Sequence, residues 1–343
     1  MQVEHTVPLS KRTFWGIGGV ADTLITVEHI AELPPLWAQL HASKTPCRIL
    51  GKGSNTAWAD AGFRGTVVHL SAAERYWQPQ PEGKMLLIAD AGVIMSQLVE
   101  DTARAGYADL ERMAGIPGQL GGFVRGNAEA FGSGTWESLQ WVDMCDGAGQ
   151  LWRIVVTQRP ENGVHSRNRA KTSQTPYGAG ERYQITSLED PTAIPHTREI
   201  LPQLYSYRMS IFKAHDDWGV LRAGFLLSVR DDPEATLQRV QSLSAHRWQT
   251  YPPGRTGGST FINPPGAYAG RLLEEAGAKG QHCGGIEITQ QHANFFRNTG
   301  HGTQEELLTL MRQYRERVER STGICLTPEV VLLDEWGRER RDY

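Results

Sequence analysis

Residues 112–132, RMAGIPGQLGGFVRGNAEAFG, constrain the fold most, because six glycines and one proline lie among apolar residues in one short stretch. A flexible linker with this much glycine would be more polar. Glycines in an apolar setting instead indicate that something flat or bulky lies against the backbone. A dinucleotide cofactor fits that description, and a glycine-rich turn between two core strands is the alternative.

A second glycine-containing stretch, GKGSNTAWAD at residues 51–60, follows a predicted strand. Gly51, Gly53 and Ser54 would bring backbone N–H groups close together, and such a nest suits a pyrophosphate. The stretch matches neither a Walker A loop nor GxGxxG. Taken alone, it favours an ordinary hairpin turn over a phosphate site.

Three further segments carry a polar side chain that chemistry could use. YSYRMSIFK sets Arg208 among aromatic residues, where its guanidinium either binds an anionic group or stacks on the rings, and the residues alone favour stacking. GGSTFINP presents Ser259 either as a turn residue or as a side chain placed against a substrate. LTPEVVLLD puts Glu329 at the mouth of the last predicted strand, where most carboxylates are simply solvated.

Short β-rich runs and amphipathic helical runs alternate along the chain, which predicts an α+β or α/β protein. Thr303 and Glu306 have the spacing of a capping box at the start of the clearest helix, and the first helix is expected to break near Pro34 and Pro35. The predicted strands are 22–27, 47–51, 65–70, 86–92, 219–229 and 329–334, with strand, turn and strand over 285–298, and the predicted helices are 28–42, 93–107, 233–248, 268–276 and 303–323.

Residues 158–203 differ from the rest, because they are polar, basic and poor in large apolar side chains. This composition predicts a surface excursion, part of it disordered. A tolerated insertion is favoured here over a functional lid.

Composition excludes several classes of protein. The net charge of −3, without a long basic run, argues against binding nucleic acid through phosphate neutralisation. No stretch approaches the roughly 18 apolar residues of a membrane span, and the N-terminus lacks the pattern of a signal peptide. The four cysteines are far apart, as unpaired thiols in a reducing cytoplasm would be. The histidines and cysteines near the C-terminus fit no usual zinc spacing, so no metal is expected.

The order of these segments is more specific than any one of them. TFWGIGG is followed by LGKGSNTAWADAGFRGTVV, AGIPGQLGGFVRGNAEAFG, YSYRMSIFK, GGSTFINPPGAYAGRLLEEAGAKG, GGIEITQQHANFFRN and LTPEVVLLD. This series resembles the UDP-N-acetylenolpyruvoylglucosamine reductase (MurB) family over most of the chain, except residues 145–203. The patterns GSxFxNP and AGIPGxxGG are the most specific parts.

The resemblance implies an α+β protein. Its two FAD-binding subdomains would have the arrangement of the vanillyl-alcohol-oxidase (PCMH) type, and a smaller α+β domain would bind the substrate. The first subdomain would comprise residues 1–70 with 327–343. The second would comprise residues 71–229, including the polar excursion at 158–203. Residues 233–326 would form the substrate-binding domain.

The resemblance also implies non-covalently bound FAD, with NADPH as the electron donor. Tyr207, Lys213, Asn263 and Glu275 are expected at the substrate, with packing or capping as the alternative for the last two. The residues expected to bind FAD are Gly51, Lys52, Gly53, Ser54, Asn55, Thr56, Ala114, Gly115, Ile116, Pro117, Gly118, Gly121, Gly122, Arg125 and Asn127.

The implied reaction is the reduction of UDP-N-acetylglucosamine enolpyruvate to UDP-N-acetylmuramate in peptidoglycan precursor synthesis. Reduced flavin would deliver hydride to C3 of the enolpyruvyl group, so that negative charge develops at C2 and spreads into the carboxylate. Arg208 matches the family's arginine and would stabilise that charge. Glu329 would orient the same region, and Ser259 matches the family's proton donor to C2. NADPH would reduce FAD and leave before the substrate enters, and the enzyme is expected to be a cytoplasmic monomer.

Two positions depart from the family pattern, because NAGAYG reads NAEAFG here and Glu129 replaces a glycine while Phe131 replaces a tyrosine. If the glycine's freedom at positive φ is needed, the local backbone differs in this chain. Two other functions stay open. One is another FAD-dependent oxidase or dehydrogenase of the same architecture, often with flavin tethered to His or Cys. The other is a non-catalytic nucleotide-binding scaffold, against which the filled positions Arg208, Ser259 and Glu329 argue.

Overall fold

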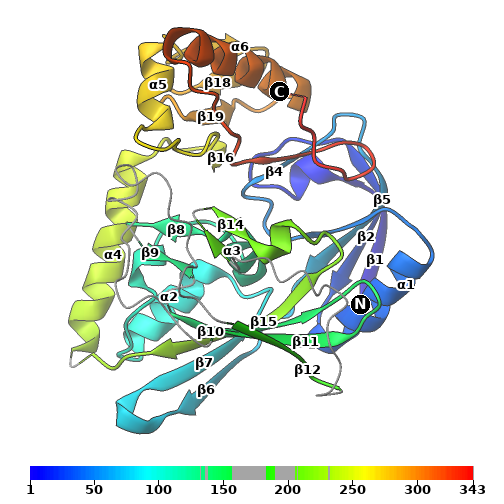
Figure 1. The fold of residues 1–343 in the computed structure, drawn as a ribbon, viewed down its shortest axis with the longest axis vertical. Helices are drawn as coiled ribbons and strands as arrows, with labels where there is room; N and C mark the ends of the chain where they lie inside the picture. The colour runs from blue at the N-terminus through cyan, green and yellow to red at the C-terminus, as the bar shows by residue number, and fades with distance from the viewer. Residues whose placement is uncertain are drawn as a thin grey trace.

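The computed structural model describes residues 1–131, 133–135, 138–156, 183–189, 205–206, 208–230 and 232–342. Helices and strands are mixed along these residues, which confirms the α+β class. Three principal sheets carry the architecture, and the third lies at one end of the long axis, away from the other two (Figure 1).

The first sheet contains, in spatial order, β1 (Gln2–Pro8), β2 (Val20–Val27), β5 (Phe63–Leu70) and β3 (Cys47–Leu50). β1 is antiparallel to β2, whereas β2 and β3 run parallel to β5. The helix predicted over 28–42 is divided near Pro34 and Pro35, as expected, because a 3₁₀ turn (Ile30–Glu32) precedes α1 (Leu33–Ala42). A proline in the first turn of a helix lacks only an N–H that would have no partner in the helix.

The second sheet contains, in spatial order, β12 (Tyr183–Ser187), β11 (Leu151–Val156), β10 (Leu139–Cys145), β15 (Gly219–Leu227), β7 (Met85–Asp90) and β6 (Arg75–Pro79). All neighbouring strands are antiparallel. Apolar residues of α1, α2 (Met95–Arg104) and α3 (Leu120–Gly126) share one buried core with this sheet. β12 falls inside the predicted excursion, so that part is an edge strand, and most of 158–203 lies outside the described residues.

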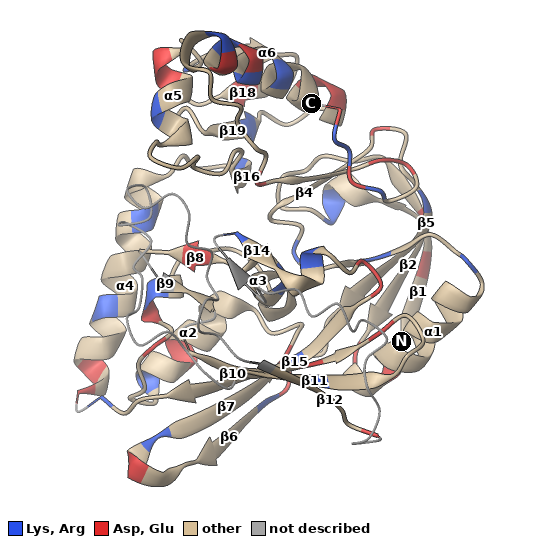
Figure 2. Ribbon diagram, in the orientation of Figure 1, with Lys and Arg blue, Asp and Glu red and all other residues tan. Residues whose placement is uncertain are grey.

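The third sheet follows α4 (Pro233–Thr250), the long helix that leads to it along one side of the molecule (Figure 1). Its strands, in spatial order, are β16 (Arg255–Ser259), β19 (Phe295–Asn298), β18 (Ile286–Ile288) and β17 (His282–Cys283). α5 (Ala269–Glu275) and α6 (Gln304–Thr322) bury apolar faces in a second core here. The capping box of Thr303 and Glu306 at α6 is confirmed. Figure 2 shows Lys and Arg interspersed with Asp and Glu along α6, so this helix presents mixed charge rather than a basic stripe.

The last strand, β20 (Val331–Leu333), returns from the third sheet to pair in parallel with β4 (Thr56–Trp58). Two short pairs complete the strands, β8 (Glu129–Ala130) with β9 (Ser133–Gly134) and β13 (Tyr205–Ser206) with β14 (Met209–Ser210). The long helices and strands predicted from the sequence are confirmed, and the predicted domain boundaries stay a prediction. No helix among the described residues has the length and apolar character needed to cross a membrane.

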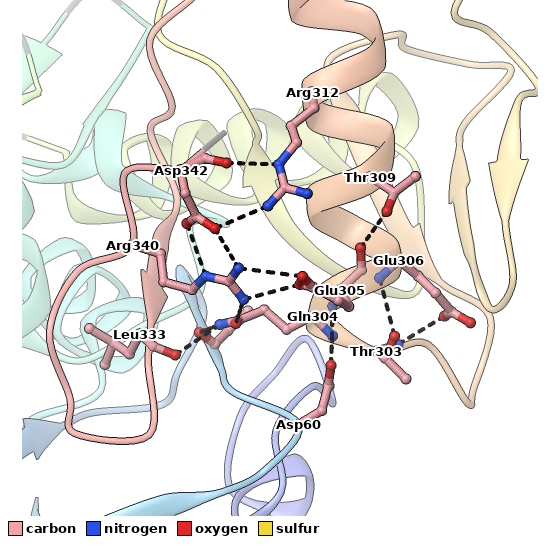
Figure 3. Close-up of polar contacts among 11 residues, drawn as sticks. Asp60, Thr303, Gln304, Glu305, Glu306, Thr309, Arg312, Leu333, Arg340 and Asp342 are labelled. Atoms are coloured by element: carbon pink, nitrogen blue, oxygen red, sulfur yellow. Dashed lines mark hydrogen bonds and ion pairs between the residues drawn. The ribbon is translucent and has the colours of Figure 1, made fainter.

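Gln304, the first residue of α6, ties the third sheet's helix to the rest of the protein (Figure 3). Its side chain is fully buried, and Nε2 donates to the carbonyls of Ala57 (2.8 Å) and Leu333 (3.0 Å). Its Oε1 accepts from Arg340 (3.1 Å). One amide thus connects α6, both strands of the β4–β20 pair and the C-terminal segment.

Replacing Gln304 with leucine should lower the free energy of unfolding by roughly 2–4 kcal/mol, because two buried carbonyls lose their donors. Chemical denaturation would measure this loss. Gln241→Leu is the matched control, since Gln241 is exposed on α4 and its replacement should leave stability within about 0.5 kcal/mol. Equal stability of the two variants would contradict the proposed connection.

Candidate active site

One cleft gathers most of the residues that the sequence analysis singled out, although they lie far apart in the chain. The turn between β3 and β4, the start of α3, the end of α4 and the end of β16 all contribute to its walls. Arg208, Ser259 and Glu329, the three predicted catalytic residues, line this same cleft.

Most of the residues predicted to bind a cofactor line the cleft as well. Ala114, Gly115 and Asn127 are not among its lining residues. Those that line it are Gly51, Lys52, Gly53, Ser54, Asn55, Thr56, Ile116, Pro117, Gly118, Gly121, Gly122 and Arg125.

The turn between β3 and β4 offers backbone donors to the cleft. The N–H groups of Lys52, Gly53, Ser54 and Asn55 donate to no other residue in the described part of the chain. Gly53 has φ +60°, and a Cβ there would lie 2.7 Å from the Cα of Thr13, so the turn needs glycine. The hairpin alternative is wrong, because β3 pairs with β5 and β4 pairs with β20.

The glycine-rich stretch faces this turn across the cleft. Gly118 has φ +146°, and a Cβ there would lie 3.0 Å from the ring of Phe123 and 3.4 Å from Oγ of Ser54. Gln119 follows, and its Nε2 donates to two backbone carbonyls, at 2.8 Å and 3.0 Å. Its Oε1 is buried without a partner among the residues described, which leaves an acceptor for a bound group.

Arg208 and Glu329 form an ion pair in the cleft wall. The guanidinium Nε lies 3.2 Å from Oε1 of Glu329, and the two side chains are 22% and 12% exposed. Nη2 of Arg208 also donates to the backbone carbonyl of Glu129 at 3.4 Å. Glu329 is therefore a largely buried, paired carboxylate, and the interpretation of it as a solvated strand-end residue is wrong.

Backbone hydrogen bonds fix Glu329 at a point where three segments meet. Its N–H donates to the carbonyl of Thr260 (2.9 Å), and its own carbonyl accepts from Nδ2 of Asn55 (3.0 Å). The N–H of Val331 donates to the carbonyl of Asn55 (2.9 Å). Because Thr260 directly follows Ser259, these contacts bring together the backbone segments that carry Ser259 and Glu329.

Burial raises the pKa of Glu329 above its ordinary value, and the carboxylate of Glu129 acts in the same direction. Arg208, Lys213 and Arg247 oppose this rise because their positive charges favour the ionised form. The charge of Glu329 thus depends on the three cations that face it.

Ser259 ends β16 beside an irregularity in the strand pairing. The register between β16 and β19 shifts between Thr256 and Ser259, and Gly258 between them has φ +82°. At Gly257, a Cβ would lie 2.6 Å from the ring of Trp15, so only glycine lets the strand pack this closely. Bulges of this kind re-aim a side chain, and Ser259 lines the cleft.

Arg247 also lines the cleft, and the sequence analysis missed it. Its guanidinium carbon lies 4.6 Å from the ring centroid of Tyr251, the residue that directly follows α4. Burial lowers the pKa of Arg247, with the positive charge of Arg208 acting the same way. The spacing of four residues between an arginine and a tyrosine was the only sequence signal for this pair.

The predicted substrate residues have different outcomes. Lys213 lines the cleft, whereas Tyr207 lies outside the described residues. Asn263 is exposed, and its Oδ1 accepts from the N–H of Ala269 (2.9 Å) at the start of α5, as in the capping alternative. Glu275 is exposed and pairs with Arg271 (2.7 Å). Neither of the last two lines the cleft, and their contact with substrate stays a prediction.

Glu129 and Phe131, the two departures from the family pattern, differ in backbone conformation. Glu129 does not have a positive φ, so the freedom of a glycine is not required at that position. Asn127 (φ +43°) and Phe131 (φ +49°) take left-handed conformations on either side of it. Glu129 is 8% exposed and lines the cleft, so the substitution adds a carboxylate to the site.

Histidine and cysteine are absent from the described lining of the cleft. Within the same described ranges, no three His, Cys, Asp or Glu side chains gather as a metal site. The cleft offers backbone N–H groups and cationic side chains as donors, and these suit an anionic organic ligand.

Known proteins are similar to this chain along nearly its whole length. Residues 21–154 match a family model described as an FAD binding domain, and residues 249–333 match one described as UDP-N-acetylenolpyruvoylglucosamine reductase, C-terminal domain. The reductase of that name from Rubrobacter xylanophilus is 35% identical over 96% of this chain and 94% of its own length. The one from Alkalilimnicola ehrlichii is 31% identical over 97% and 95%. A crystal structure of the reductase (MurB) from Thermus caldophilus superposes with a TM-score of 0.67 at 27% identity, covering 97% of this chain and 99% of that one.

Proposed function

The chain belongs to the UDP-N-acetylenolpyruvoylglucosamine reductase family, and on that basis we propose how its own residues carry out the family reaction. The enzyme reduces UDP-N-acetylglucosamine enolpyruvate through FAD, with NADPH as the reductant, in peptidoglycan precursor synthesis. The observation that supports our residue assignments is that Arg208, Glu329 and Ser259 line one cleft with a nest of backbone donors.

The cleft fits FAD. The N–H groups of residues 52–55 are available to its diphosphate, and the glycines facing them leave room where a Cβ would intrude. Trp58 and Gln119 line the cleft, and Nε1 of Trp58 and Oε1 of Gln119 are buried without a partner in the part of the chain described, so each can pair with a polar group of the cofactor. When bound, FAD supplies the hydride and accepts electrons from NADPH. Because no His or Cys of the described segments lines the cleft and could form a tether, we infer non-covalent binding.

Arg208 holds the substrate's carboxylate end. Its guanidinium is fixed and partly desolvated by Glu329, so it faces developing negative charge without reorganising first. Glu329 orients Arg208 in this role. Arg247 adds a second cation to the same wall, where it attracts an anionic substrate.

Ser259 donates the proton that C2 needs. Its hydroxyl makes no hydrogen bond to any residue of the described segments, so it is available to a bound molecule. A serine hydroxyl is a weak acid, and proton transfer from it requires a strongly basic carbon, which the charge at C2 provides. Because the proton from Ser259 reaches C2 from one face only, it sets the configuration of the lactyl group.

The three-part division of the chain remains our proposal, with two FAD-binding subdomains and residues 233–326 on the substrate. The three sheets and the return of β20 to β4 support it. We also propose that the enzyme acts as a monomer in the cytoplasm, where NADPH and nucleotide sugars are present.

Oxidation of NADPH by the purified, FAD-loaded protein tests the function. It should depend on UDP-N-acetylglucosamine enolpyruvate and yield UDP-N-acetylmuramate, with the flavin released into the supernatant by acid precipitation. Colour retained in the pellet, without turnover of this substrate, would favour a related flavin oxidase. Protein that takes up no FAD would favour a nucleotide-binding scaffold.

A further inference from the structure

We propose that Lys213 is a positioning residue that holds Arg208 in its working conformation, rather than a ligand of the substrate. This inference rests on the proposed role of Arg208. It changes the expectation from the sequence, which placed Lys213 at the substrate.

Arg208 has a backbone conformation that arginine seldom adopts. Its φ is +60°, in the left-handed region where the Cβ of an L-residue is crowded. Such conformations persist only where surrounding contacts impose them, and they cluster at active sites. Some group must therefore fix the peptide that carries the guanidinium.

The ammonium of Lys213 makes that contact. Its Nζ donates to the carbonyl oxygen of Arg208 at 2.8 Å, five residues back along the chain. This carbonyl belongs to the peptide that follows the left-handed residue, so the bond resists rotation of that peptide. A charged donor makes a stronger hydrogen bond than a neutral one.

The segment from Arg208 to Lys213 also forms hydrogen bonds with the last turn of α3. Oγ of Ser210 donates to the carbonyl of Arg125 at 2.5 Å. The guanidinium of Arg125 donates in turn to the carbonyl of Phe212 and to Asp216. These contacts hold Ser210 and Phe212 in place, whereas the contact from Lys213 reaches the carbonyl of Arg208 itself. Lys213 therefore connects the peptide of Arg208 to a segment that α3 holds in place.

The charge of Lys213 has a second effect, on Glu329. The groups that face Glu329 are Arg208, Lys213 and Arg247, which favour its ionised form, and Glu129, which opposes it. Burial lowers the pKa of Lys213, with Arg125 and Arg208 acting in the same direction, and Glu329 and Glu339 counteract this fall. Removal of the lysine charge thus raises the pKa of Glu329 and moves the acid limb of the pH profile to higher pH.

Three variants separate these effects when the reoxidation of NADPH-reduced flavin by substrate is followed in single turnovers. Lys213→Met should slow the limiting rate by about 10- to 100-fold, the cost of a small misplacement of a catalytic group. The apparent substrate Kd should change less than about twofold, because no substrate contact is lost. Lys213→Arg, which keeps the donor and the charge, should restore part of the rate and keep the acid limb. Lys213→Gln, which keeps only a donor, should restore part of the rate with the acid limb shifted upward.

Lys84→Met is the matched control, since Lys84 lies on the β6–β7 hairpin outside the cleft and should behave as wild type. An increased Kd with an unchanged limiting rate in Lys213→Met would show that Lys213 binds substrate, and would overturn the proposal. An unchanged rate and Kd would overturn it as well.

A crystal structure of Lys213→Met, or of Lys213→Gln if the first variant does not fold, tests without any activity measurement whether Lys213 holds the conformation of Arg208. We expect Arg208 to leave the left-handed region and its contact with Glu329 to lengthen in the methionine variant, and the peptide to stay in place in the glutamine variant. Retention of both features in Lys213→Met, or loss of both in Lys213→Gln, would overturn the proposal. A wild-type enzyme that does not turn over the substrate would defeat the proposed function alone, because the structural outcome can still be read.

Discussion

Replacing Ser259 with alanine is expected to leave the reduction of flavin by NADPH intact and to slow its reoxidation by the enolpyruvyl substrate by about 10²–10⁴-fold, the usual contribution of a general acid. The separation arises because the hydroxyl is needed only once C2 becomes basic. Ser259 lies at the strand end, beside a register shift, so the smaller side chain should not disturb the fold. Stopped-flow absorbance of the flavin measures both half-reactions.

Ser242→Ala is the matched control, because Ser242 is exposed on α4, outside the cleft, and its hydroxyl only caps a carbonyl of its own helix. Both half-reactions of this control should match the wild type. If Ser259→Ala reoxidises as fast as the control, another group donates the proton and the role assigned to Ser259 is wrong.

Replacing Arg208 with methionine is expected to slow the reoxidation of reduced flavin by the substrate by about 10³-fold or more. The change removes the fixed cation that stabilises the negative charge developing at C2. Methionine preserves much of the length and apolar stem of arginine. The change also leaves Glu329 without the strongest influence that lowers its pKa, so residual activity should be confined to higher pH. Single-turnover rates across pH would test both parts.

Arg320→Met on the last turn of α6 is the control, because Arg320 is exposed and lies outside the cleft. Circular dichroism and flavin content would establish that the Arg208 variant is folded and loaded. A folded, loaded Arg208→Met enzyme with reoxidation like that of the control would exclude Arg208 from stabilising the charge.

Much of the site could be predicted from the sequence because its parts lie in short local patterns. The glycine-rich stretch that contains α3 carries a local signal for a bound cofactor, whereas the nest at Gly53 is recognised only together with the other motifs. The serine and the two charged residues could be named only through the order of the motifs. The sequences YSYRMSIFK and LTPEVVLLD do not by themselves predict that Arg208 and Glu329 form an ion pair, because this pair depends on the pairing of the last strand, β20, with β4.

The features that sequence reasoning missed are nonlocal or concern individual side chains. β12 lies in a stretch whose polar composition predicted an excursion, and its pairing with β11 is what makes it a strand. Gln304 looks like an ordinary residue at a helix start, and only the fold shows that its amide is buried between two strands. The contact of Lys213 with the peptide of Arg208 depends on the left-handed conformation there, which no residue preference predicts.

The parallel pairing of β4 with β20 has a consequence for synthesis on the ribosome. Thr56 leaves the ribosome early, but its pairing partner Val331 is made only when the polypeptide is almost complete. Glu329 reaches its place only when this pairing closes, and Asn55 of the cofactor nest gains its contacts with Glu329 and Val331 at the same moment. Contacts of such long sequence separation form late and slowly. Maturation of the enzyme should therefore be a post-translational event, with catalytic competence appearing after the earlier sheets have folded.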